Sequence, residues 1–230
     1  MTDMQDIASR LARVQESIRA CERRHGRAPG SVALVAVSKT QGAVAIASAF
    51  VLGQRAFGEN YVQEALAKVA ALAALPIEWH FIGPLQANKT AEVAANFSWV
   101  HTIDRMRIAQ RLNNQRPGHL PPLNVLIQVN VSGEETKHGI VAEALPALAG
   151  EIAALPRLRL RGLMTLPAPT PDFAAQRAAF ATLAELARRC PVPLDSLSMG
   201  TSDDFEAAIA EGATMVRIGT AVFGPRRKAA

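Results

Sequence analysis

The sequence predicts a single (β/α)8 barrel, and three observations support this fold class. Short apolar segments alternate with longer amphipathic segments along most of the 230-residue chain, which is the pattern of parallel strands joined by crossover helices. Eight strand-like segments can be counted, the number that closes such a barrel. No linker rich in Pro, Gly or Ser divides the chain. We therefore expect one domain over 1–230, with an open doubly wound sheet as the structural alternative.

The elements follow one another in a regular order. Ile7, Leu11, Val14 and Ile18 recur at helical spacing, which predicts an extra helix over 3–25, within an N-terminal segment 1–28. The barrel is expected over 32–224. Its strands are predicted at 32–38, 55–57, 78–82, 98–102, 123–131, 158–164, 194–198 and 214–218. Its helices are predicted at 43–52, 61–74, 86–95, 104–115, 141–154, 172–189 and 202–210.

The first predicted strand contains six consecutive apolar residues, from Val32 to Val37. A short apolar run without alternation is typical of a strand that is buried on both faces, as in a parallel sheet. This run is also far shorter than the roughly 20 apolar residues that span a bilayer. The segment therefore supports a barrel of parallel strands and no membrane partner.

The composition is that of a folded globular protein, with 49% hydrophobic and 20% charged residues, and it excludes a disordered chain. The first ten residues include acidic side chains and no apolar stretch, unlike a secretory leader. Two cysteines make no disulfide framework, so we expect a cytoplasmic protein. The net charge is +5, but the arginines are scattered, which favours a solvated basic surface and no nucleic-acid partner. The histidines show no metal-ligand spacing.

Polar residues gather where the predicted strands end, and barrel active sites lie at the carboxyl ends of the strands. Lys39 follows the first strand and Asn60 follows the second. A lysine between a buried strand and this polar rim is partly desolvated, which lowers its pKa and frees the amine to attack a carbonyl. A snorkelling or ion-paired lysine is the structural alternative. Lys39 is therefore a candidate nucleophile.

The last two strand ends predict an anion site, because (β/α)8 barrels commonly bind phosphate in these loops. Residues 198–202 follow the seventh strand, and Gly219 and Thr220 follow the eighth. Glycine permits close approach of the backbone, while hydroxyls and amides at a helix start can hold an anion. Helix capping by Thr201 or Ser202 is the simpler explanation of the first segment. Two adjacent hydroxyl-glycine ends are better explained by a phosphate.

An amine nucleophile beside a phosphate site suggests pyridoxal 5′-phosphate (PLP) as cofactor. Arg217 ends the eighth strand and could reach the pyridine nitrogen. Because arginine only donates hydrogen bonds, it would keep that nitrogen unprotonated. An unprotonated pyridine is a poor electron sink, which argues against general carbanion chemistry. A structural ion pair at the rim is the alternative role for Arg217.

Five ordered motifs resemble one known family. They are 36–40 (AVSKT), 57–64 (FGENYVQE), 80–89 (HFIGPLQANK), 197–204 (LSMGTSDD) and 216–220 (VRIGT). Together they are similar to the pyridoxal phosphate homeostasis protein family, of the YggS/PROSC type, and the resemblance runs over nearly the whole chain. It implies a single-domain barrel resembling the N-terminal domain of alanine racemase. It also implies a protein that holds PLP as a lysine Schiff base for PLP supply and balance, without established turnover.

The resemblance further implies roles for individual residues. Lys39 would form the bond to PLP, Asn60 would lie beside the ring, and Arg217 would face the ring nitrogen. The phosphate would be held by a larger set: Ser198, Gly219, Thr220 and the backbone of Met199 and Gly200. Lys89 and Lys137 match family lysines suggested to help transfer or secondary binding. PLP-dependent apo-enzymes would be the partners.

The sequence departs from the family at two places. Thr201 stands where many members have methionine, and the segment after Gly224 lacks the tyrosine that many members place there. A second hydroxyl at position 201 should not harm phosphate binding. Any contact made by that tyrosine in other members is in doubt here.

Two enzyme activities remain as alternatives. A PLP-dependent amino-acid racemase needs a second acid–base group opposite Lys39, usually a tyrosine from a separate domain. The single tyrosine, Tyr61, adjoins the 58–60 motif, where packing or capping is the better-suited role, and the barrel uses the whole chain. A Schiff-base aldolase would use Lys39 without a cofactor, but leaves Arg217 and the two phosphate loops less well explained. We therefore expect a PLP-binding protein without efficient catalysis.

Overall fold

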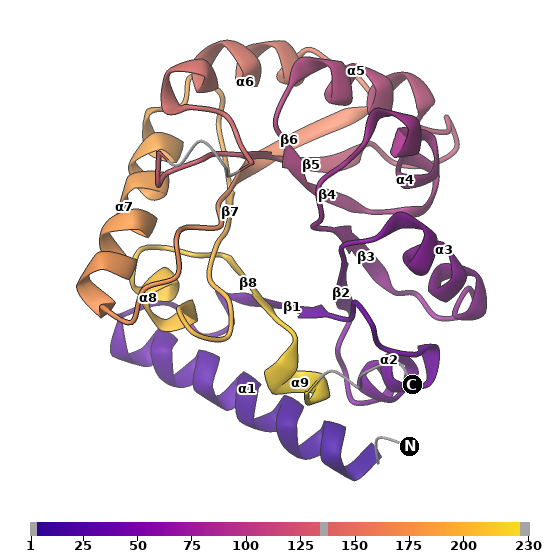
Figure 1. Ribbon diagram of the computed structural model, residues 1–230, viewed down its shortest axis with the longest axis vertical. Coiled ribbons are helices and arrows are strands. Elements are labelled where there is room, and N and C mark those ends of the chain that lie inside the picture. Colours follow the sequence, from indigo (N-terminus) through magenta and orange to yellow (C-terminus); the bar gives the residue numbers. More distant parts are fainter. Residues whose placement is uncertain (1–3, 134–137, 226–230) are drawn as a thin grey trace.

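A closed barrel of eight parallel strands forms the centre of the computed structural model, which describes residues 4–133 and 138–225 (Figure 1). The strands follow one another around the barrel in sequence order, and the last pairs with the first. They are β1 (Ala33–Val37), β2 (Ala56–Glu59), β3 (Glu78–Phe81), β4 (Trp99–Ile103), β5 (Leu123–Gln128), β6 (Leu158–Met164), β7 (Ser196–Ser198) and β8 (Met215–Ile218). Each lies where the sequence predicts a strand. The predicted barrel is confirmed, and the open sheet is excluded.

Helices surround the barrel on its outside (Figure 1). They are α2 (Ala43–Val51), α3 (Val62–Ala71), α4 (Thr90–Asn96), α5 (Met106–Gln115), α6 (Leu145–Ala153), α7 (Phe173–Arg189) and α8 (Phe205–Ala210). The 3-10 turns η1 (Ala87–Lys89) and η2 (Ala142–Ala144) precede α4 and α6. The predicted helices at these two places include the turns, because a single 3-10 turn hardly changes the apolar spacing. The short α9 (Thr220–Phe223) is not predicted, since one turn is too short to show a periodic pattern.

The N-terminal helix α1 (Met4–Arg24) covers the seam where β8 meets β1. It packs against α2, α8 and α9, and Figure 1 shows it running past the two C-terminal helices. Its buried face contains Ile7, Leu11, Val14 and Ile18, at the spacing of an amphipathic helix. Within the described residues, which end at 225, the single turn of α9 is the helix that follows β8. The predicted extra helix thus supplies cover that a full crossover helix gives elsewhere in such barrels.

The interior of the barrel changes from apolar to polar along its axis. Val35, Trp99, Leu126, Met164 and Met215 form a small apolar cluster with one residue from each of five strands. Since alternate residues of a strand point to opposite faces, these residues must fill the barrel interior. Two positions further along β4 and β8 the inward residues are polar and buried: His101 and Arg217. This polar layer lies toward the carboxyl ends of the strands, where the site is predicted.

Three further observations apply to the described part of the chain. None of its helices is both long and apolar enough to span a membrane. No group of three or more His, Cys, Asp or Glu side chains in these ranges could hold a metal ion. Cys21 and Cys190 are both free thiols.

Candidate ligand-binding site

A cavity of about 200 Å³ opens at the carboxyl ends of the strands, where the predicted site residues meet. Five of them line it: Lys39 after β1, Asn60 after β2, Arg217 in β8, and Gly219 and Thr220 after β8. Parallel strands in a closed barrel end at one rim, which explains why residues so far apart in sequence share one cavity. An amine, a cation and a hydroxyl therefore face the same space.

The rest of the cavity wall combines apolar and hydroxyl-bearing side chains. Val37, Ile82 and Leu166 supply the apolar part, and Thr201 and Ser202 complete the wall. An aromatic ring with a charged substituent is the kind of ligand that such a wall suits.

Arg217 is fixed in place by two hydrogen bonds. Its NH1 group donates to Ser198 Oγ over 2.7 Å, and its NH2 group donates to the Thr165 carbonyl oxygen over 2.8 Å. Burial lowers the pKa of Arg217 to about 10, so the guanidinium remains charged at neutral pH. A guanidinium has five N–H donors, and these two bonds leave donors for a ligand in the cavity.

Asn60 presents an unsatisfied acceptor. Its Oδ1 atom is buried and has no hydrogen-bond partner within the described residues. A buried carbonyl oxygen without a donor is destabilising, and a ligand hydroxyl or amine in the cavity would remove that cost.

The two hydroxyl residues after β7 differ in how they are used. Thr201 donates its hydroxyl and its backbone N–H to Asp204 Oδ1, over 2.9 and 2.5 Å. Asp204 is the N-cap of α8, and residues 202–204 form a turn before it. Neither Thr201 nor Ser202 is therefore the N-cap that the capping explanation expected, and the Thr201 hydroxyl is already used by Asp204. Ser202 and Thr220 are the better hydroxyls for a bound anion.

Glycines allow the loops at this end of the barrel to approach closely. A Cβ atom on Gly219 would lie 3.1 Å from the Val37 carbonyl oxygen. Gly200 has φ +93°, and a Cβ atom there would lie 2.7 Å from the Ala208 Cβ atom. The Gly200 carbonyl also accepts the Arg217 backbone N–H over 2.9 Å. Gly200 thus helps to fix the backbone of Arg217 through this hydrogen bond.

Three of the predicted phosphate residues do not line the cavity that contains Lys39. Ser198 ends β7 with its hydroxyl buried inside the barrel, 2.8 Å from His101 Nδ1. Met199 is fully buried. Gly200 lines an adjoining cavity of about 240 Å³, which shares Arg217 with the first. Ser202, which belongs to the predicted anion loop 198–202, lines the cavity of Lys39, whereas Ser198 does not.

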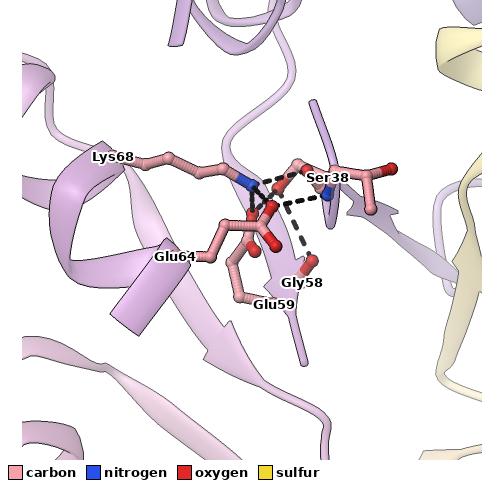
Figure 2. Close-up of polar contacts among 6 residues, drawn as sticks. Ser38, Gly58, Glu59, Glu64 and Lys68 are labelled. Atoms are coloured by element: carbon pink, nitrogen blue, oxygen red, sulfur yellow. Dashed lines mark hydrogen bonds and ion pairs between the residues drawn. The ribbon is translucent and has the colours of Figure 1, made fainter. Parts of the chain in front are cut away.

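A mostly buried charged cluster of Lys68, Glu59 and Glu64 contacts Ser38, the residue before Lys39 (Figure 2). Lys68 Nζ, from α3, donates to Glu59 Oε1 over 2.7 Å and to Glu64 Oε1 over 2.6 Å. It also donates to the Ser38 carbonyl oxygen over 2.7 Å. Burial raises the pKa of Glu59, while the hydrogen bonds from Lys68 and Ser38 oppose that rise. The ammonium group therefore compensates a carboxylate that has no solvent contact.

Both chain neighbours of Lys39 are tied to this cluster. The Ser38 hydroxyl donates to Glu59 Oε1 over 2.5 Å, and the Thr40 backbone N–H donates to Glu64 Oε1 over 2.5 Å. Thr40 has φ +66°, an uncommon conformation for a β-branched residue. The cluster holds this bend and so fixes the direction in which Lys39 leaves the backbone.

Lys89 and Lys137, the lysines predicted to help transfer or secondary binding, differ in what the structure describes. Lys89 ends η1, forms an ion pair with Glu92 at 3.4 Å, and lines a second cavity of about 350 Å³. This second cavity shares Asn60 with that of Lys39 and also includes Tyr61, which is 59% exposed. Tyr61 does not line the cavity of Lys39. Lys137 lies outside the described residues.

The largest of the cavities described here, of about 390 Å³, lies between α1 and the loops after β7 and β8. It shares Ser202 and Thr220 with the cavity of Lys39, and Arg10 and Arg13 line its other side. Volume alone does not mark a functional site. The smaller cavity contains the convergent reactive and polar groups.

Several known proteins are similar to this chain in sequence, in structure or in both. The family model described as alanine racemase, N-terminal domain, matches residues 9–227. A pyridoxal phosphate homeostasis protein of Pseudomonas aeruginosa is 59% identical over 223 residues, which cover 97% of each chain. The structure of PipY from Synechococcus elongatus with PLP bound has a TM-score of 0.80 at 37% identity, over 95% of this chain and 100% of PipY. Alanine racemase from Corynebacterium glutamicum shares the fold, with a TM-score of 0.70 at 19% identity, and this chain covers 62% of it.

Proposed function

Because this chain belongs to the alanine racemase N-terminal domain family, and within it to the pyridoxal phosphate homeostasis proteins, we propose that it binds PLP through Lys39 for intracellular PLP supply and balance, without efficient catalysis. One observation carries this proposal: an amine, a donor-only cation and three hydroxyl side chains line one small cavity. PLP offers a partner to each of these groups, namely an aldehyde, a ring nitrogen and a phosphate. Free thiols at both cysteines are consistent with the cytoplasm as its location.

The residues fit PLP group by group. When bound, PLP supplies an aldehyde that condenses reversibly with an amine. Lys39 would hold it covalently, and Ser202 and Thr220 would donate to the phosphate. Asn60 Oδ1, which lacks a partner within the described residues, would accept a hydrogen bond from the ligand. Arg217 would donate to the ring nitrogen.

Arg217 also limits the chemistry that this site can perform. Its pKa of about 10 keeps the guanidinium charged at neutral pH, so it cannot serve as a proton donor that leaves the ring nitrogen protonated. Electron withdrawal by the ring therefore stays weak. Tyr61, the residue that a racemase would need as second base, is exposed and outside this cavity. A racemase function has less support than storage and release.

The decisive test of covalent binding is an absorbance spectrum of the purified protein with PLP, followed by borohydride reduction and peptide mass mapping. We expect a single label at Lys39, lost in Lys39→Ala. A protein that stays unlabelled would refute the proposal, and a label only at Lys89 or Lys137 would relocate the site.

The phosphate assignment is tested by comparing three serine and threonine variants. Hydrogen bonds to a charged group contribute roughly 1.5–3 kcal/mol each, so we expect Ser202→Ala with Thr220→Ala to weaken PLP binding by about a hundredfold or more. If Ser198→Ala alone had the larger effect, with Arg217 unmoved, the phosphate would lie at Ser198 as the sequence predicts.

The absence of efficient turnover is tested in heavy water. The PLP-loaded protein is incubated with L-amino acids, and deuterium at the Cα atom is followed by mass spectrometry. We expect almost no exchange. Exchange at about 1–1000 per second, the usual enzymatic range, would favour the racemase alternative.

PLP-dependent apo-enzymes are the proposed recipients of the cofactor. An apo-transaminase mixed with the loaded protein should regain activity, whereas the borohydride-reduced protein should give none. Reactivation faster than with free PLP at the same concentration would indicate direct transfer. Failure to reactivate the enzyme at all would contradict a role in supply.

A further inference from the structure

A chain of hydrogen bonds runs through the inside of the barrel from the ligand cavity to its opposite end. We call it the interior relay, and its members are Arg217, Ser198, His101, His80 and Glu78. The bond from Arg217 NH1 to Ser198 Oγ is 2.7 Å, and Ser198 Oγ lies 2.8 Å from His101 Nδ1. His101 Nε2 lies 2.9 Å from His80 Nδ1, and His80 Nε2 lies 2.7 Å from Glu78 Oε1.

The relay is sealed from solvent except at one end. Ser198 and His101 have no exposed surface, and His80 is 1% exposed. Arg217 is 4% exposed. Glu78, the first residue of β3, has a side chain that is 49% exposed. The relay therefore connects the floor of the ligand cavity with a carboxylate at the amino-terminal mouth of the barrel.

Both ends of the relay impose the same direction on its protons. At one end Arg217 can only donate, so Ser198 accepts from it and has its own O–H left for His101 Nδ1. At the other end the Glu78 carboxylate can only accept, so His80 must carry its proton on Nε2. Neutral His80 then accepts at Nδ1, and the proton of His101 lies on Nε2. The proton positions worked out from the Arg217 end and from the Glu78 end agree at His101, which accepts at Nδ1 and donates from Nε2.

The neutral state of both histidines follows from their surroundings. Burial lowers the pKa of His80, and burial lowers the pKa of His101 well below its ordinary value, with the neighbouring His80 and Arg217 acting in the same direction. A hydrogen bond from His80 lowers the pKa of Glu78. The contact between His80 and Glu78 is thus a hydrogen bond from a neutral ring to a carboxylate.

We propose that His101 and His80 are positioning residues that hold the Arg217 guanidinium at the cavity through this one-directional relay. Each member offers a lone pair toward Arg217 and a proton toward Glu78, so all the dipoles stabilise a cation at one end and an anion at the other. No carboxylate forms an ion pair with Arg217 within the described residues. Asp204 stabilises the charged guanidinium electrostatically from a greater distance, and the relay adds to this compensation through direct hydrogen bonds.

The effect on ligand binding rests on the proposed function, because it requires PLP to lie against Arg217. Without the relay, the NH1 group of Arg217 loses a fixed acceptor and keeps only the bond from NH2 to Thr165. The guanidinium can then turn away from the position in which it meets a ring nitrogen. Glu78, far along the barrel from the cavity, should influence the cavity through the relay alone.

The first experiment uses the protein without PLP. Long-range ¹H–¹⁵N NMR spectra of ¹⁵N-histidine-labelled protein distinguish the two neutral tautomers and the protonated ring, and His80→Gln and His101→Gln assign the signals. At pH 7 we expect both histidines to be neutral with the proton on Nε2. A proton on Nδ1 of either ring, or a charged ring, would overturn the relay.

The second experiment measures PLP affinity and the absorption band of bound PLP, which responds to the hydrogen bond at the ring nitrogen. His101→Leu breaks the relay next to Ser198, and Glu78→Gln keeps an acceptor but removes the charge. Leu112→Ala, in the buried layer of α5 outside the barrel, is the control for stability loss. We expect the Kd to rise about tenfold in His101→Leu, as for one hydrogen bond of a charged group.

We expect Glu78→Gln to raise the Kd by about two- to fivefold through the weakened last bond, and both relay variants to shift the absorption band. Leu112→Ala should leave the band unchanged. Glu78→Gln keeps the test valid if His101→Leu does not fold, because its site is half-exposed. Unchanged affinity and spectrum in a folded relay variant would refute the positioning role. If the wild-type protein bound no PLP, the proposed function and the positioning role would fail together, while the tautomers would still decide the order of the relay.

Discussion

Replacing Lys68 with methionine removes the ammonium group from the mostly buried charged cluster that contacts Ser38. Three bonds of 2.6–2.7 Å are lost, to Glu59, Glu64 and the Ser38 carbonyl oxygen. Glu59 is the partner that matters most, because it is fully buried and cannot turn to solvent. Breaking one partner out of a buried ion pair typically costs about 3–5 kcal/mol.

Protonation of Glu59 sets an upper limit on the part of this cost that comes from its unpaired charge. Keeping a carboxyl with an ordinary pKa of 4.5 protonated at pH 7 costs about 3.4 kcal/mol, at 1.36 kcal/mol per pH unit. We therefore expect Lys68→Met to lower the free energy of unfolding by about 3 kcal/mol at pH 7. The folded variant then holds a neutral Glu59 whose pKa lies above that in the unfolded chain. The loss of stability of Lys68→Met relative to the wild-type protein should therefore shrink by about 1.4 kcal/mol per pH unit as the pH falls from 7 to 5.

Urea unfolding followed by circular dichroism at pH 7 and 5.5 measures both quantities. Lys89→Met is the matched control, since that lysine is half-exposed with one ion pair at 3.4 Å, and it should lose less than about 1 kcal/mol. The double variant Glu59→Gln with Lys68→Met removes both charges and should regain more than half of the loss. A deficit below about 1 kcal/mol at pH 7, or one that does not change with pH, would refute this reasoning.

Three other outcomes can be measured with the same assay. Burial lowers the pKa of His80 and His101 from the ordinary value of 6.5, so the unfolded chain binds protons that the folded state does not. As the pH falls from 7.5 to 5.5, the free energy of unfolding should therefore decrease by up to about 1.4 kcal/mol per histidine. The decrease should be smaller in His101→Leu. Gly200 and Gly212 both have a positive φ, of +93° and +100°, but of these two only at Gly200 would a new Cβ atom come within 3 Å of another atom. Gly200→Ala and Gly212→Ala should each lower the free energy of unfolding by about 1–3 kcal/mol through backbone strain. The loss should be larger for Gly200→Ala, which should also bind PLP more weakly. Gly150 lies inside α6 with open space around it, so Gly150→Ala should stabilise the fold by about 0.5–1 kcal/mol, and a destabilised variant would contradict the helical assignment.

The barrel and the meeting of its distant residues are predictable from the sequence for a physical reason. A strand buried on both faces is mostly apolar, so a segment such as 32–37 is conspicuous. Once eight such segments are accepted as parallel strands of a barrel, their carboxyl ends must share one rim. Lys39, Arg217 and Gly219 then approach one another whatever the details of the loops, as the structure shows.

The position of Ser198 depends on a finer detail. β7 contains only three residues, and Ser198 is the last of them, so its side chain still follows the alternation of the strand and points inward. If the strand ended one residue earlier, the same hydroxyl would be free to reach the rim. Sequence patterns rarely fix a strand end to one residue, so the motif alone could not show which of Ser198 and Ser202 lines the cavity.

Lys68 is missed for a different reason. It follows Glu64 by four residues on a helix, and such a pair is ordinarily a solvent-exposed ion pair of small energetic weight. Burial arises because Glu59 leaves β2 on the side that faces α3 and brings a second carboxylate to the ammonium group. The proximity of Glu59 to that pair within the chain was the available signal.

The position of α1 has a consequence for how the chain is made. It is synthesised before the barrel strands, while two of the elements against which it packs, α8 and α9, come after nearly all of them. β1 likewise waits for β8 before the barrel can close. During synthesis, the apolar face of α1 therefore has only part of its final cover, and contacts between such distant segments form slowly. The nascent chain, more than the finished barrel, is the form that depends on protection from aggregation.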